Sequence, residues 1–513
     1  MNLNAFLDQE ENVRLIQLGL LFLFVVYAAR LFAHTTADVD LWGYLAFGRL
    51  FWETGRFPYQ DIFTYVPTHP MWVYHEWLTG VIYYPLYTKI GAWALQVLKY
   101  AVAGGTFAMV YLVARRCGAD FWGTLCCLFI LATYLPSGYA PVRAQIFTYF
   151  FFVLTVYLLE RSRSSQSWLS LGWLIPLQIV WCNMHGGFLA GLGLIGIYAC
   201  GEALARRPFW PFLLTFVLAG MATLINPYGY KYWLYLIPAV TMPRPEIGEW
   251  ASTVATLMGG PYRMISVYFL LIVYIVLSLL WLSRPRDITL YLVLGITLLL
   301  GLKHMRHQTF FLLAASVYMA APFSDFLGRL RHYAILQPLF TRLQVYYYVV
   351  AYLGLLSYVS WQLGGLSPCQ LLTPSSSEHY EQRIYYPTAA LEYVRKHNLT
   401  GKIVTEFHWG EYLLWHLHPQ CLIVLDGRYE TVYPEKVVRP YMDFIAGREG
   451  WQCFLEEYPP DMILIKNNTK LAKFLRERQD WQEVFADQGS ILFLRQESSA
   501  HVSASQPSSP RPD

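Results

Sequence analysis

Long apolar runs separated by short polar loops make up most of the first 363 residues of the chain. Runs close to the roughly 20 residues that cross a bilayer recur at about 14–33, 92–114, 119–136, 143–160, 168–182, 185–205, 208–225, 263–283, 287–302, 308–323 and 343–363. This pattern predicts a polytopic α-helical membrane protein with about 11 transmembrane helices. Residues 77–91 are also apolar but short, and we interpret them as an interfacial or re-entrant helix. If they cross the membrane instead, the orientation of every later helix reverses.

The charges of the short loops predict how these helices are oriented. One set of alternate loops holds clustered arginines, at 115–116, 161–163, 206–207, 284–286 and 329–342. The other set holds few basic residues but most of the His, Asn, Asp and Trp. By the positive-inside rule, the arginine-rich loops face the cytoplasm. We therefore expect a multi-pass protein of the plasma (inner) membrane, with a cytoplasmic N-terminus and with the segment after residue 363 outside.

The pattern changes after about residue 364, where short apolar strands alternate with amphipathic helices. Strands are expected at 402–407, 421–425, 461–466 and 491–495, and helices at 387–398, 409–417, 434–446 and 468–479. Such alternation is typical of a small, mostly parallel three-layer α/β domain. The expected division is a transmembrane domain (1–363) with an external loop (34–76), an extracytoplasmic α/β domain (364–497) and a disordered, Ser- and Pro-rich tail (498–513).

Composition supports a membrane protein and excludes a nucleic-acid-binding one. Of 513 residues, 56% are hydrophobic and only 14% are charged, whereas a soluble protein carries about 25% charged residues. The net charge of +4 is small and dispersed, so no nucleic-acid partner is expected. The eight cysteines show no metal-type spacing.

The first external loop carries the most unusual polar residues. A carboxylate at the centre of a membrane helix costs about 2.5–3.5 kcal/mol, so carboxylates beside a bilayer are expected at an interface or a water-filled site. Here acidic, aromatic and His side chains crowd together, and we take them as candidate site residues: Asp38, Asp40, Trp42, His75, Glu76 and Trp77. An enzyme that acts on a lipid-linked polar substrate would keep its chemistry at such a place.

Other polar residues fall at the same predicted outer face, although they are far apart in the sequence. They are Arg143, Asn183, His185, Glu249, His304, Arg306 and His307. Taken singly, each has a simpler interpretation, such as a basic side chain that reaches the headgroups or an Asn that satisfies a helix end. A shared polar cavity explains the whole set better.

Two segments of the α/β domain follow predicted strands, at the edge where ligands gather in parallel sheets. Trp409 follows the first strand, and Asp426-Gly427-Arg428 follows the second. We take Trp409, Asp426 and Arg428 as candidate substrate-binding residues. The alternative is a structural Asp–Arg pair that caps the sheet.

The layout at this point resembles the GT-C superfamily of integral-membrane glycosyltransferases. Residues 40–46 are similar to the Asp-Glu-x-x-Tyr-x-x-x-Ala pattern of protein mannosyltransferases and aminoarabinose transferases, with Leu41 in place of the Glu. Other segments resemble a bacterial family of GT-C-like membrane proteins, namely 38–78, 181–187, 226–229 and 426–428. Residues 409–412 are distantly similar to the Trp-Trp-Asp-Tyr-Gly segment of oligosaccharyltransferase catalytic subunits, without extending to sequon recognition.

The resemblance implies a transferase that uses a polyprenyl-phosphate-linked sugar and an acidic residue in the first external loop. Asp40 matches that residue, and we expect it to act as the general base. Asp38 could hold a divalent cation such as Mg²⁺ or Mn²⁺ together with Asp40. Arg143 and Arg306 are the expected ligands of the leaving phosphate, with His185, His304 and His307 as secondary donors. Sugar contacts are expected from His75, Glu76, Trp42, Trp77, Asn183 and Glu249.

The predicted function is therefore a membrane glycosyltransferase (hexosyl or pentosyl) that moves a sugar from a polyprenyl-phosphate donor to an extracytoplasmic acceptor. The acceptor stays open between a lipid, a glycan and a protein, and membrane lipids are further partners. A lipid or polysaccharide transporter would predict charges near the membrane midplane and an inverted repeat, and the sequence shows neither. A non-catalytic assembly protein would not need acidic, basic and His residues from so many loops.

Overall fold

The computed structural model describes the chain over 10–331 and 369–496 and at 354–355 and 358, with gaps at 136–140, 166, 243, 245–246, 260–261, 283–286, 380 and 383. The predicted span at 343–363 falls almost entirely outside these residues, and the predicted tail at 498–513 lies wholly outside them. The chain forms two compact units. The first comprises Met1–His34 and Gln96–Cys369, and the second comprises Thr35–Leu95 and Gln370–Asp513. The first external loop therefore folds as part of the same unit as the C-terminal segment.

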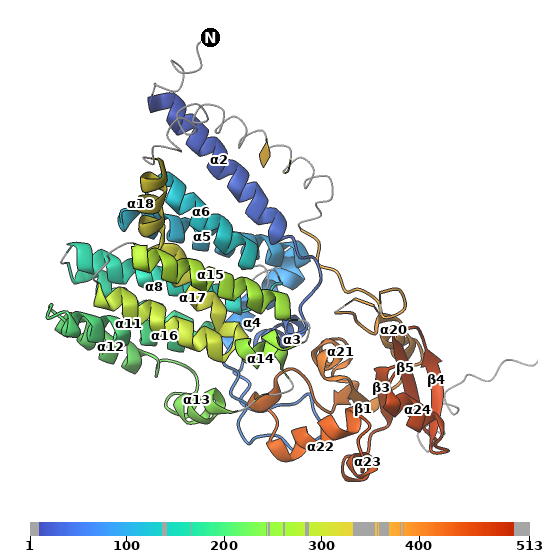
Figure 1. The fold of residues 1–513 in the computed structure, drawn as a ribbon. Coiled ribbons are helices and arrows are strands. Elements are labelled where there is room, and N and C mark those ends of the chain that lie inside the picture. Colours follow the sequence, from blue (N-terminus) through green and yellow to red (C-terminus); the bar gives the residue numbers. More distant parts are fainter. Residues whose placement is uncertain are drawn as a thin grey trace, which may run out of the picture. The chain divides into compact units, whose positions relative to one another are not determined.

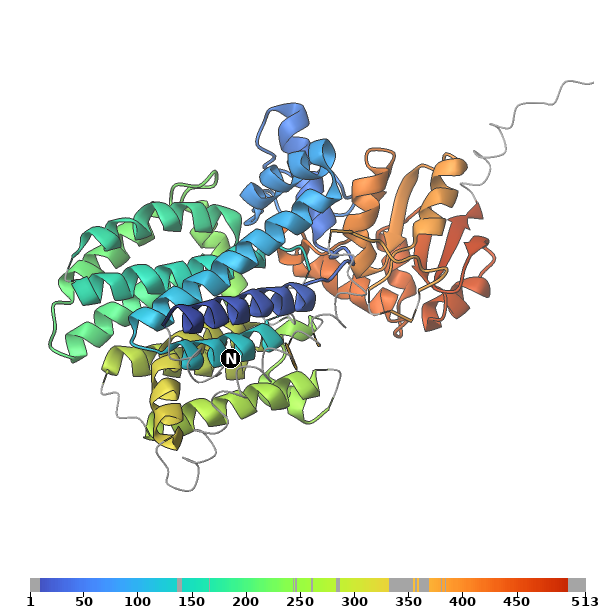
Figure 2. The ribbon, with the colours of Figure 1, turned by 90° about the horizontal axis from the view of Figure 1, so that it is seen from above.

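The first unit is helical. Its elements are α2 (Glu10–Leu31), α5 (Ala92–Arg116), α6 (Phe121–Tyr134), α8 (Gln145–Ser165), α9 (Leu169–Gly172), α10 (Leu174–Met184), α11 (Phe188–Leu204), α12 (Trp210–Ala222), α13 (Lys231–Thr241), η2 (Gly248–Trp250), α14 (Thr253–Leu257), α15 (Arg263–Leu282), α16 (Ile288–Lys303), η3 (Met305–His307), α17 (Gln308–Tyr318) and α18 (Ala320–Arg331). Figure 1 shows α11, α16 and α17 side by side, and α16 packs against both others. Figure 2 shows α2 along α5, joined by the edge-on rings of Phe24 and Phe107 at 5.5 Å.

Helix lengths within this unit only partly match the predicted spans. In the described part of the chain, three helices are long and apolar enough to cross a membrane: Val13–Leu31, Ala92–Arg116 and Arg263–Leu282. The pair Met305–Tyr318 and Ala320–Leu330, bent by 52°, passes the same test as one broken span. Other apolar helices are shorter, because the fold interrupts runs that look continuous in sequence. The predicted number of about 11 spans is therefore not confirmed.

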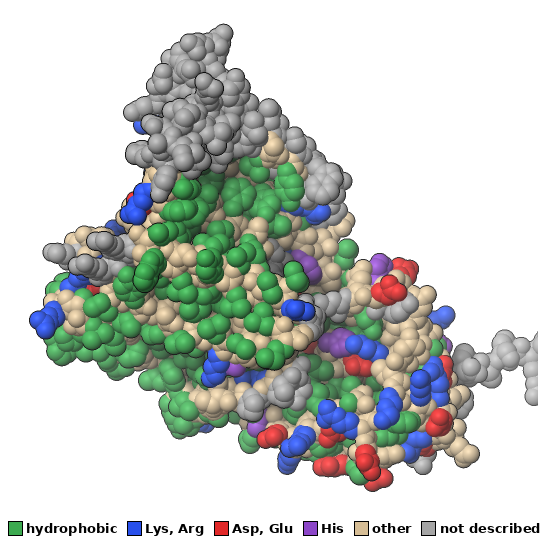
Figure 3. All heavy atoms as spheres, in the orientation of Figure 1, with side chains coloured by type: hydrophobic (Ala, Val, Ile, Leu, Met, Phe, Trp, Pro, Cys, Tyr) green, Lys and Arg blue, Asp and Glu red, His purple; other side chains and the backbone are tan. Residues whose placement is uncertain are grey.

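Apolar side chains cover the outside of several of these helices. On α15, Met264, Tyr274 and Trp281 are 75%, 69% and 89% exposed. Figure 3 shows hydrophobic side chains gathered over the surface of the helical unit. A large contiguous apolar surface marks a membrane or protein contact rather than a water-facing one. This surface supports the interpretation of the unit as a membrane-embedded one.

One partly buried ionic cluster ties three of these helices together. The Arg163 guanidinium on α8 lies 3.0 Å from Glu160, 2.9 Å from Glu202 on α11 and 2.7 Å from Asp287, the residue that precedes α16. A guanidinium with three carboxylate partners satisfies its donors well when it is buried. The cluster therefore fixes the ends of α8, α11 and α16 relative to one another.

The second unit is an α/β fold built on one mixed sheet. Its elements are α3 (Leu41–Thr54), α4 (Trp77–Pro85), η1 (Leu86–Ile90), α20 (Thr388–Lys396), β1 (Gly401–Thr405), η4 (Phe407–Trp409), α21 (Gly410–Leu417), β2 (Cys421–Ile423), η5 (Tyr429–Thr431), α22 (Glu435–Ile445), α23 (Gln452–Glu457), β3 (Met462–Lys466), α24 (Lys470–Arg476), β4 (Trp481–Ala486) and β5 (Ser490–Arg495). The strand order is β2-β1-β3-β5-β4.

Half of the strand pairs in this sheet are antiparallel, which differs from the predicted mostly parallel sheet. β1 is parallel to β2 and β3, whereas β5 is antiparallel to β3 and β4. The reason is the short connection between β4 and β5, since only an antiparallel pair can be joined by a tight turn. β4 was not among the predicted strands.

The first external loop is built into this unit by main-chain hydrogen bonds. The Ile423 N–H donates to the Phe63 carbonyl at 2.9 Å, next to the end of β2. The Ala37 N–H donates to the Leu372 carbonyl at 2.8 Å. Helix α3 packs against both α4 and α21, and α4 is a nine-residue helix, shorter than the roughly 20 residues of a membrane span. The loop thereby places the start of α3 beside the start of α21.

Candidate functional site

Asp38 and Asp40 lie at the N-terminus of α3. Asp40 is the N-cap residue and is half-buried. The buried Asp38 carboxylate accepts a hydrogen bond from the Asp40 N–H at 3.1 Å, so it shapes the turn that begins the helix. The partial positive charge of a helix N-terminus favours a nearby carboxylate by about 0.3–1 kcal/mol. Asp40 therefore lies at the end of α3 that carries this partial positive charge.

Glu411 lies beside Asp40. It belongs to the segment 409–412 that follows the first predicted strand, but it was not among the candidate site residues. Its side chain, from the first turn of α21, accepts a hydrogen bond at Oε2 from the Gly43 N–H at 2.9 Å. A Cβ placed on Gly427 would lie 2.8 Å from Glu411 Oε1 and 3.5 Å from Asp40 Oδ1. The two carboxyl groups therefore flank the same point. Residues 368 positions apart make this contact, which explains why the sequence did not reveal it.

The environment of Glu411 disfavours its charge. Burial raises the pKa of Glu411 well above its usual value, and the nearby Asp40 and Asp426 raise it further, whereas Arg428 and the Gly43 N–H act in the opposite direction. The helix N-terminus stabilises the charged form by only about 0.3–1 kcal/mol. Burying an ionised carboxylate costs several kcal/mol. Glu411 therefore holds its proton to a higher pH than a free Glu does.

Asp426 and Arg428 form a buried ionic pair. Nε and Nη2 of Arg428 donate to the two carboxylate oxygens of Asp426 at 2.8 and 2.6 Å, and Nη1 donates to Asp61. The Tyr433 hydroxyl donates to Asp426 at 2.7 Å, and the guanidinium lies 4.9 Å from the Trp72 ring centre. Burial alone would lower the pKa of Arg428, but Asp426 and Asp61 raise it well above its usual value.

These hydrogen bonds support the alternative interpretation, in which Asp426 and Arg428 are a structural pair rather than substrate-binding residues. With 1% of its side chain exposed, Arg428 has its charge compensated from both sides. A substrate would have to displace a bidentate carboxylate to reach it. The pair instead joins the first external loop, through Asp61, to the segment after β2.

The predicted aromatic contacts of this unit are mostly enclosed. Trp42 is buried, with Tyr412 edge-on at 5.2 Å. Trp409 is fully buried, and its indole N–H donates to the Tyr385 carbonyl at 2.9 Å. Trp77 packs edge-on against Phe57 at 5.5 Å. These rings pack within the fold, which leaves little face for a sugar.

His75 and Glu76 are the more accessible members of the predicted set. His75 Nε2 lies 3.9 Å from Glu76 Oε1, with 25% and 15% of the two side chains exposed. They immediately precede α4, the helix that packs along α3. Their assignment as sugar-binding residues stays a prediction.

In the first unit, a second group of predicted residues comes together around Trp250. The Arg143 guanidinium bonds to the Glu249 carboxylate at 2.9 Å. Arg306 lies 4.6 Å from the centre of the Trp250 ring, and His304 Nδ1 lies 2.7 Å from the Trp250 carbonyl oxygen. The His304 and His307 rings are 5.5 Å apart. The structure therefore assembles these five predicted residues, and we refer to them with Trp250 and Arg244 as the Trp250 cluster.

Arg244 is a member of the Trp250 cluster that sequence reasoning missed. Its guanidinium lies 4.4 Å from the centre of the Trp250 ring, and Nη2 donates to the Ala239 carbonyl at 2.7 Å. Guanidinium groups favour aromatic faces because the ring carries negative charge there. The only sequence signal was a single Arg between two prolines, at 243 and 245.

His185 and Asn183 are engaged at the turn between α10 and α11. His185 Nδ1 lies 2.8 Å from the Thr148 hydroxyl and 2.9 Å from the Gly187 N–H. The Asn183 amide donates to the Ile225 carbonyl at 2.9 Å. For Asn183, this contact supports the simpler interpretation that it satisfies a helix end.

The predicted divalent-cation site of Asp38 and Asp40 stays a prediction. Within the described ranges, no three His, Cys, Asp or Glu side chains are grouped so that they could hold a metal ion. The Asp38 carboxylate is occupied in the turn before α3, and Mg²⁺ requires near-ideal octahedral oxygen geometry. No step of the chemistry below is therefore assigned to a metal.

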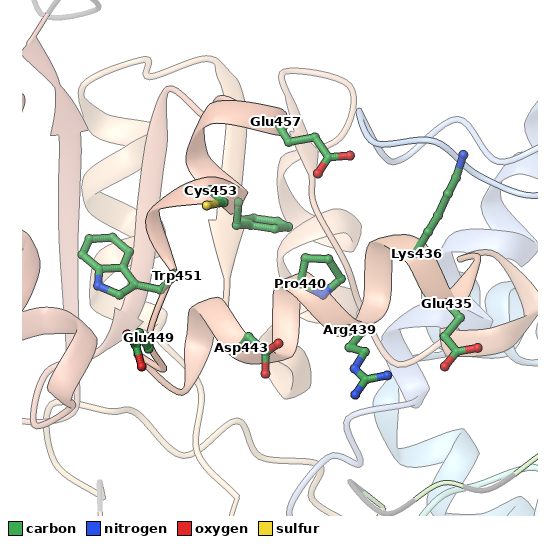
Figure 4. Close-up of a pocket in the computed structure, with 11 residues that line it drawn as sticks. Glu435, Lys436, Arg439, Pro440, Asp443, Glu449, Trp451, Cys453 and Glu457 are labelled. Atoms are coloured by element: carbon green, nitrogen blue, oxygen red, sulfur yellow. The ribbon is translucent and has the colours of Figure 1, made fainter.

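A cavity of about 510 Å³ lies on the second unit between α22 and α23. Figure 4 shows its lining, with charged side chains such as Lys436, Arg439 and Glu457 beside Trp451 and Cys453. None of the predicted site residues lines it. Its mixed charges are typical of a solvated helix face.

Comparison with known proteins identifies the fold. No protein-family model matches the chain. No curated protein sequence matches it at a significant level. The structure of an oligosaccharyltransferase from Archaeoglobus fulgidus, in complex with zinc and sulfate, aligns with a TM-score of 0.51 at 12% identity, over 86% of this chain and 68% of the other. ArnT from Cupriavidus metallidurans, bound to undecaprenyl phosphate, aligns with a TM-score of 0.50 at 13% identity, over 93% of this chain and 97% of the other.

The chain shares the fold of these two proteins. The resemblance to GT-C glycosyltransferases inferred from residues 38–78 and 40–46 is confirmed at the level of the fold. At these identities the likeness carries no information about the substrate. The roles of individual side chains therefore have to be argued from their geometry.

Proposed function

We propose that this protein is a membrane glycosyltransferase that transfers a sugar from a polyprenyl-phosphate-linked donor to an extracytoplasmic acceptor. The fold alignment with ArnT, over 93% of this chain, is the observation that carries the proposal. ArnT was crystallised with undecaprenyl phosphate, which has the chemical class of the released product. The proposal places the protein in the inner membrane, with its N-terminus in the cytoplasm and the α/β domain outside.

Asp40 is the proposed general base. It lies half-buried at the N-terminus of α3, and a carboxylate is a group that can accept a proton. The acceptor hydroxyl gives its proton to Asp40, and its oxygen attacks the anomeric carbon of the sugar. A positioned base contributes about 10²–10⁴-fold to such a step.

The Trp250 cluster is the proposed site of the leaving phosphate. As the bond between the anomeric carbon and the phosphate oxygen breaks, its electron pair moves to the phosphate. Arg143 and Arg306 would stabilise that charge through guanidinium–phosphate hydrogen bonds. Arg244 shares the Trp250 ring with Arg306 and adds positive charge to the same cluster.

Release of polyprenyl phosphate tests this proposal. The full chain in bacterial membrane vesicles, which supply acceptors, is given polyprenyl-phosphate donors that carry labelled hexoses or pentoses. We expect polyprenyl phosphate to be released in step with transfer of the label to an acceptor. Passage of the intact donor across the membrane without release would indicate a flippase instead, and would contradict the transferase assignment.

A further inference from the structure

Two guanidinium groups lie over the ring of Trp250, the last residue of η2. The Cζ atom of Arg244 is 4.4 Å from the ring centre, and the Cζ atom of Arg306 is 4.6 Å from it. Both distances fall within about 6 Å, the range over which a cation is attracted to an aromatic face, and Trp is the ring that attracts it most strongly. Arg244 precedes η2 and Arg306 belongs to η3, so the fold brings two separate segments to one ring.

The two arginines differ in what their N–H groups contact. Arg244 is 7% exposed, and its guanidinium donates to the Ala239 carbonyl at 2.7 Å and to the Met242 carbonyl at 3.4 Å. Arg306 is partly exposed and rests on the Trp250 ring. Among the residues that the structure describes, no carboxylate or carbonyl bonds to its guanidinium. Attraction to a ring face does not use up the N–H donors, so the five donors of Arg306 remain available for an anion.

The backbone around Trp250 is fixed to the turn that carries Arg306. His304 Nδ1 lies 2.7 Å from the Trp250 carbonyl oxygen, and the Met305 N–H donates to the Ala251 carbonyl at 3.0 Å. His304 and Met305 directly precede Arg306 in the chain. The ring and the guanidinium that lies over it are therefore held together by bonds on neighbouring residues of both segments.

We propose that Trp250 is a positioning residue that holds the guanidinium of Arg306 ready for the phosphate group of the lipid-linked donor. This inference rests on the proposed role of the Trp250 cluster in phosphate binding. An arginine side chain has many rotamers, and fixing it before the donor arrives reduces the entropy that binding would otherwise lose. The ring acts through Arg306 and takes no part in the chemical step.

The first test measures the Kd of undecaprenyl phosphate for the purified full chain in detergent. Trp250→Leu keeps an apolar side chain but removes the aromatic face, so we expect binding to weaken by about 3- to 30-fold. Trp250→Phe keeps a face and should bind within about threefold of the wild type. The control is Trp281→Leu, the same exchange at a position that is 89% exposed, and it should bind as the wild type does. A Leu variant that binds as tightly as the wild type, or a Phe variant as weak as the Leu variant, would overturn the proposal.

The second test combines Trp250→Leu with Arg306→Ala in the same binding titration. Arg306→Ala alone should weaken binding by roughly 10- to 100-fold. Once that guanidinium is gone the ring has nothing left to hold for the phosphate, so adding Trp250→Leu should change the Kd by less than about twofold. Full multiplication of the two single effects would overturn the positioning role and leave the phosphate site standing. Wild-type binding by Arg306→Ala would overturn both.

Discussion

The two units of this protein collect opposite charges. In the second unit, carboxyl groups outnumber cations around the start of α3, where Asp40, Glu411 and Asp426 have Arg428 as a counter-charge. In the first unit, Arg143, Arg244 and Arg306 gather at the Trp250 cluster, and Glu249 supplies the counter-charge. A carboxylate can accept a proton, and a guanidinium can hold an anion. The difference suits one unit to activating an acceptor and the other to holding a leaving phosphate.

The same comparison separates structural arginines from those that can bind a substrate. Arg428 has 1% of its side chain exposed and bonds to two carboxylates. Arg143 has 19% exposed and pairs with Glu249, which is itself 38% exposed. Exposed ion pairs are weak, at about 0–1 kcal/mol, so Glu249 can be displaced. Accessibility, rather than charge alone, therefore identifies Arg143 as the candidate for substrate binding.

Removing the base should have the largest effect. Asp40→Asn keeps the size of the side chain but cannot accept the proton, so we expect the rate of polyprenyl phosphate release to fall by about 10²–10⁴-fold. The amount of protein in the membrane should stay the same. Asp443→Asn, an exchange on a more exposed carboxylate of α22, is the matched control and should keep full activity. Full activity of Asp40→Asn would remove this residue from the base role.

Arg428→Ala should break the fold rather than the chemistry. It leaves Asp426 and Asp61 buried without their counter-charge, which is expected to lower the free energy of unfolding by about 3–5 kcal/mol. Denaturant unfolding in detergent measures this loss. Arg448→Ala removes an exposed pair with Asp443 and should cost less than about 1 kcal/mol. A stable but inactive Arg428→Ala protein would instead assign Arg428 to the substrate.

Arg143→Ala should weaken use of the donor without unfolding the protein. Loss of a hydrogen bond to a charged group corresponds to about 1.5–3 kcal/mol, so kcat/KM for the donor should fall by roughly 10- to 100-fold. The melting temperature should change little. Arg207→Ala, whose side chain is 49% exposed, is the control and should leave donor use unchanged. An equal loss of activity in both variants would argue against a specific phosphate contact.

Glu249→Gln should have the smallest effect, and with the opposite sign. Under the proposed function Glu249 competes with phosphate for Arg143, so removing its charge should tighten the binding of undecaprenyl phosphate by up to about fivefold. A binding titration with the purified full chain measures the Kd. Weaker binding would show that Glu249 contacts the donor, as the sequence analysis predicted.

The sequence predicts local features well. The helix at 387–398 and the strands at 402–407 and 421–425 match α20, β1 and β2 to within two residues, because each apolar run ends at Gly, Pro or a polar turn. β4 escaped notice because its exposed Gln482 and Glu483 obscure the alternation that marks a strand. Helix breaks inside continuous apolar runs could not be predicted either, because hydropathy does not report where a helix ends.

Prediction from sequence was also limited for the candidate site, where contacts join residues that are far apart in the chain. Asp426 and Arg428 are two residues apart, and their pairing was weighed from the sequence alone. Their third partner, Asp61, is 367 residues away, as distant as Glu411 is from Gly43. No periodicity encodes such contacts, which arise only when the first external loop folds onto the C-terminal segment. Sequence reasoning therefore found most of the chemical groups, without Arg244 and Glu411, but not their neighbours.

An experimental structure of the full chain with bound undecaprenyl phosphate tests the central claim most directly, namely that the Trp250 cluster holds the phosphate of the donor. We predict that the phosphate oxygens lie within hydrogen-bond distance of Arg143 and Arg306. A phosphate bound away from these arginines would contradict the account.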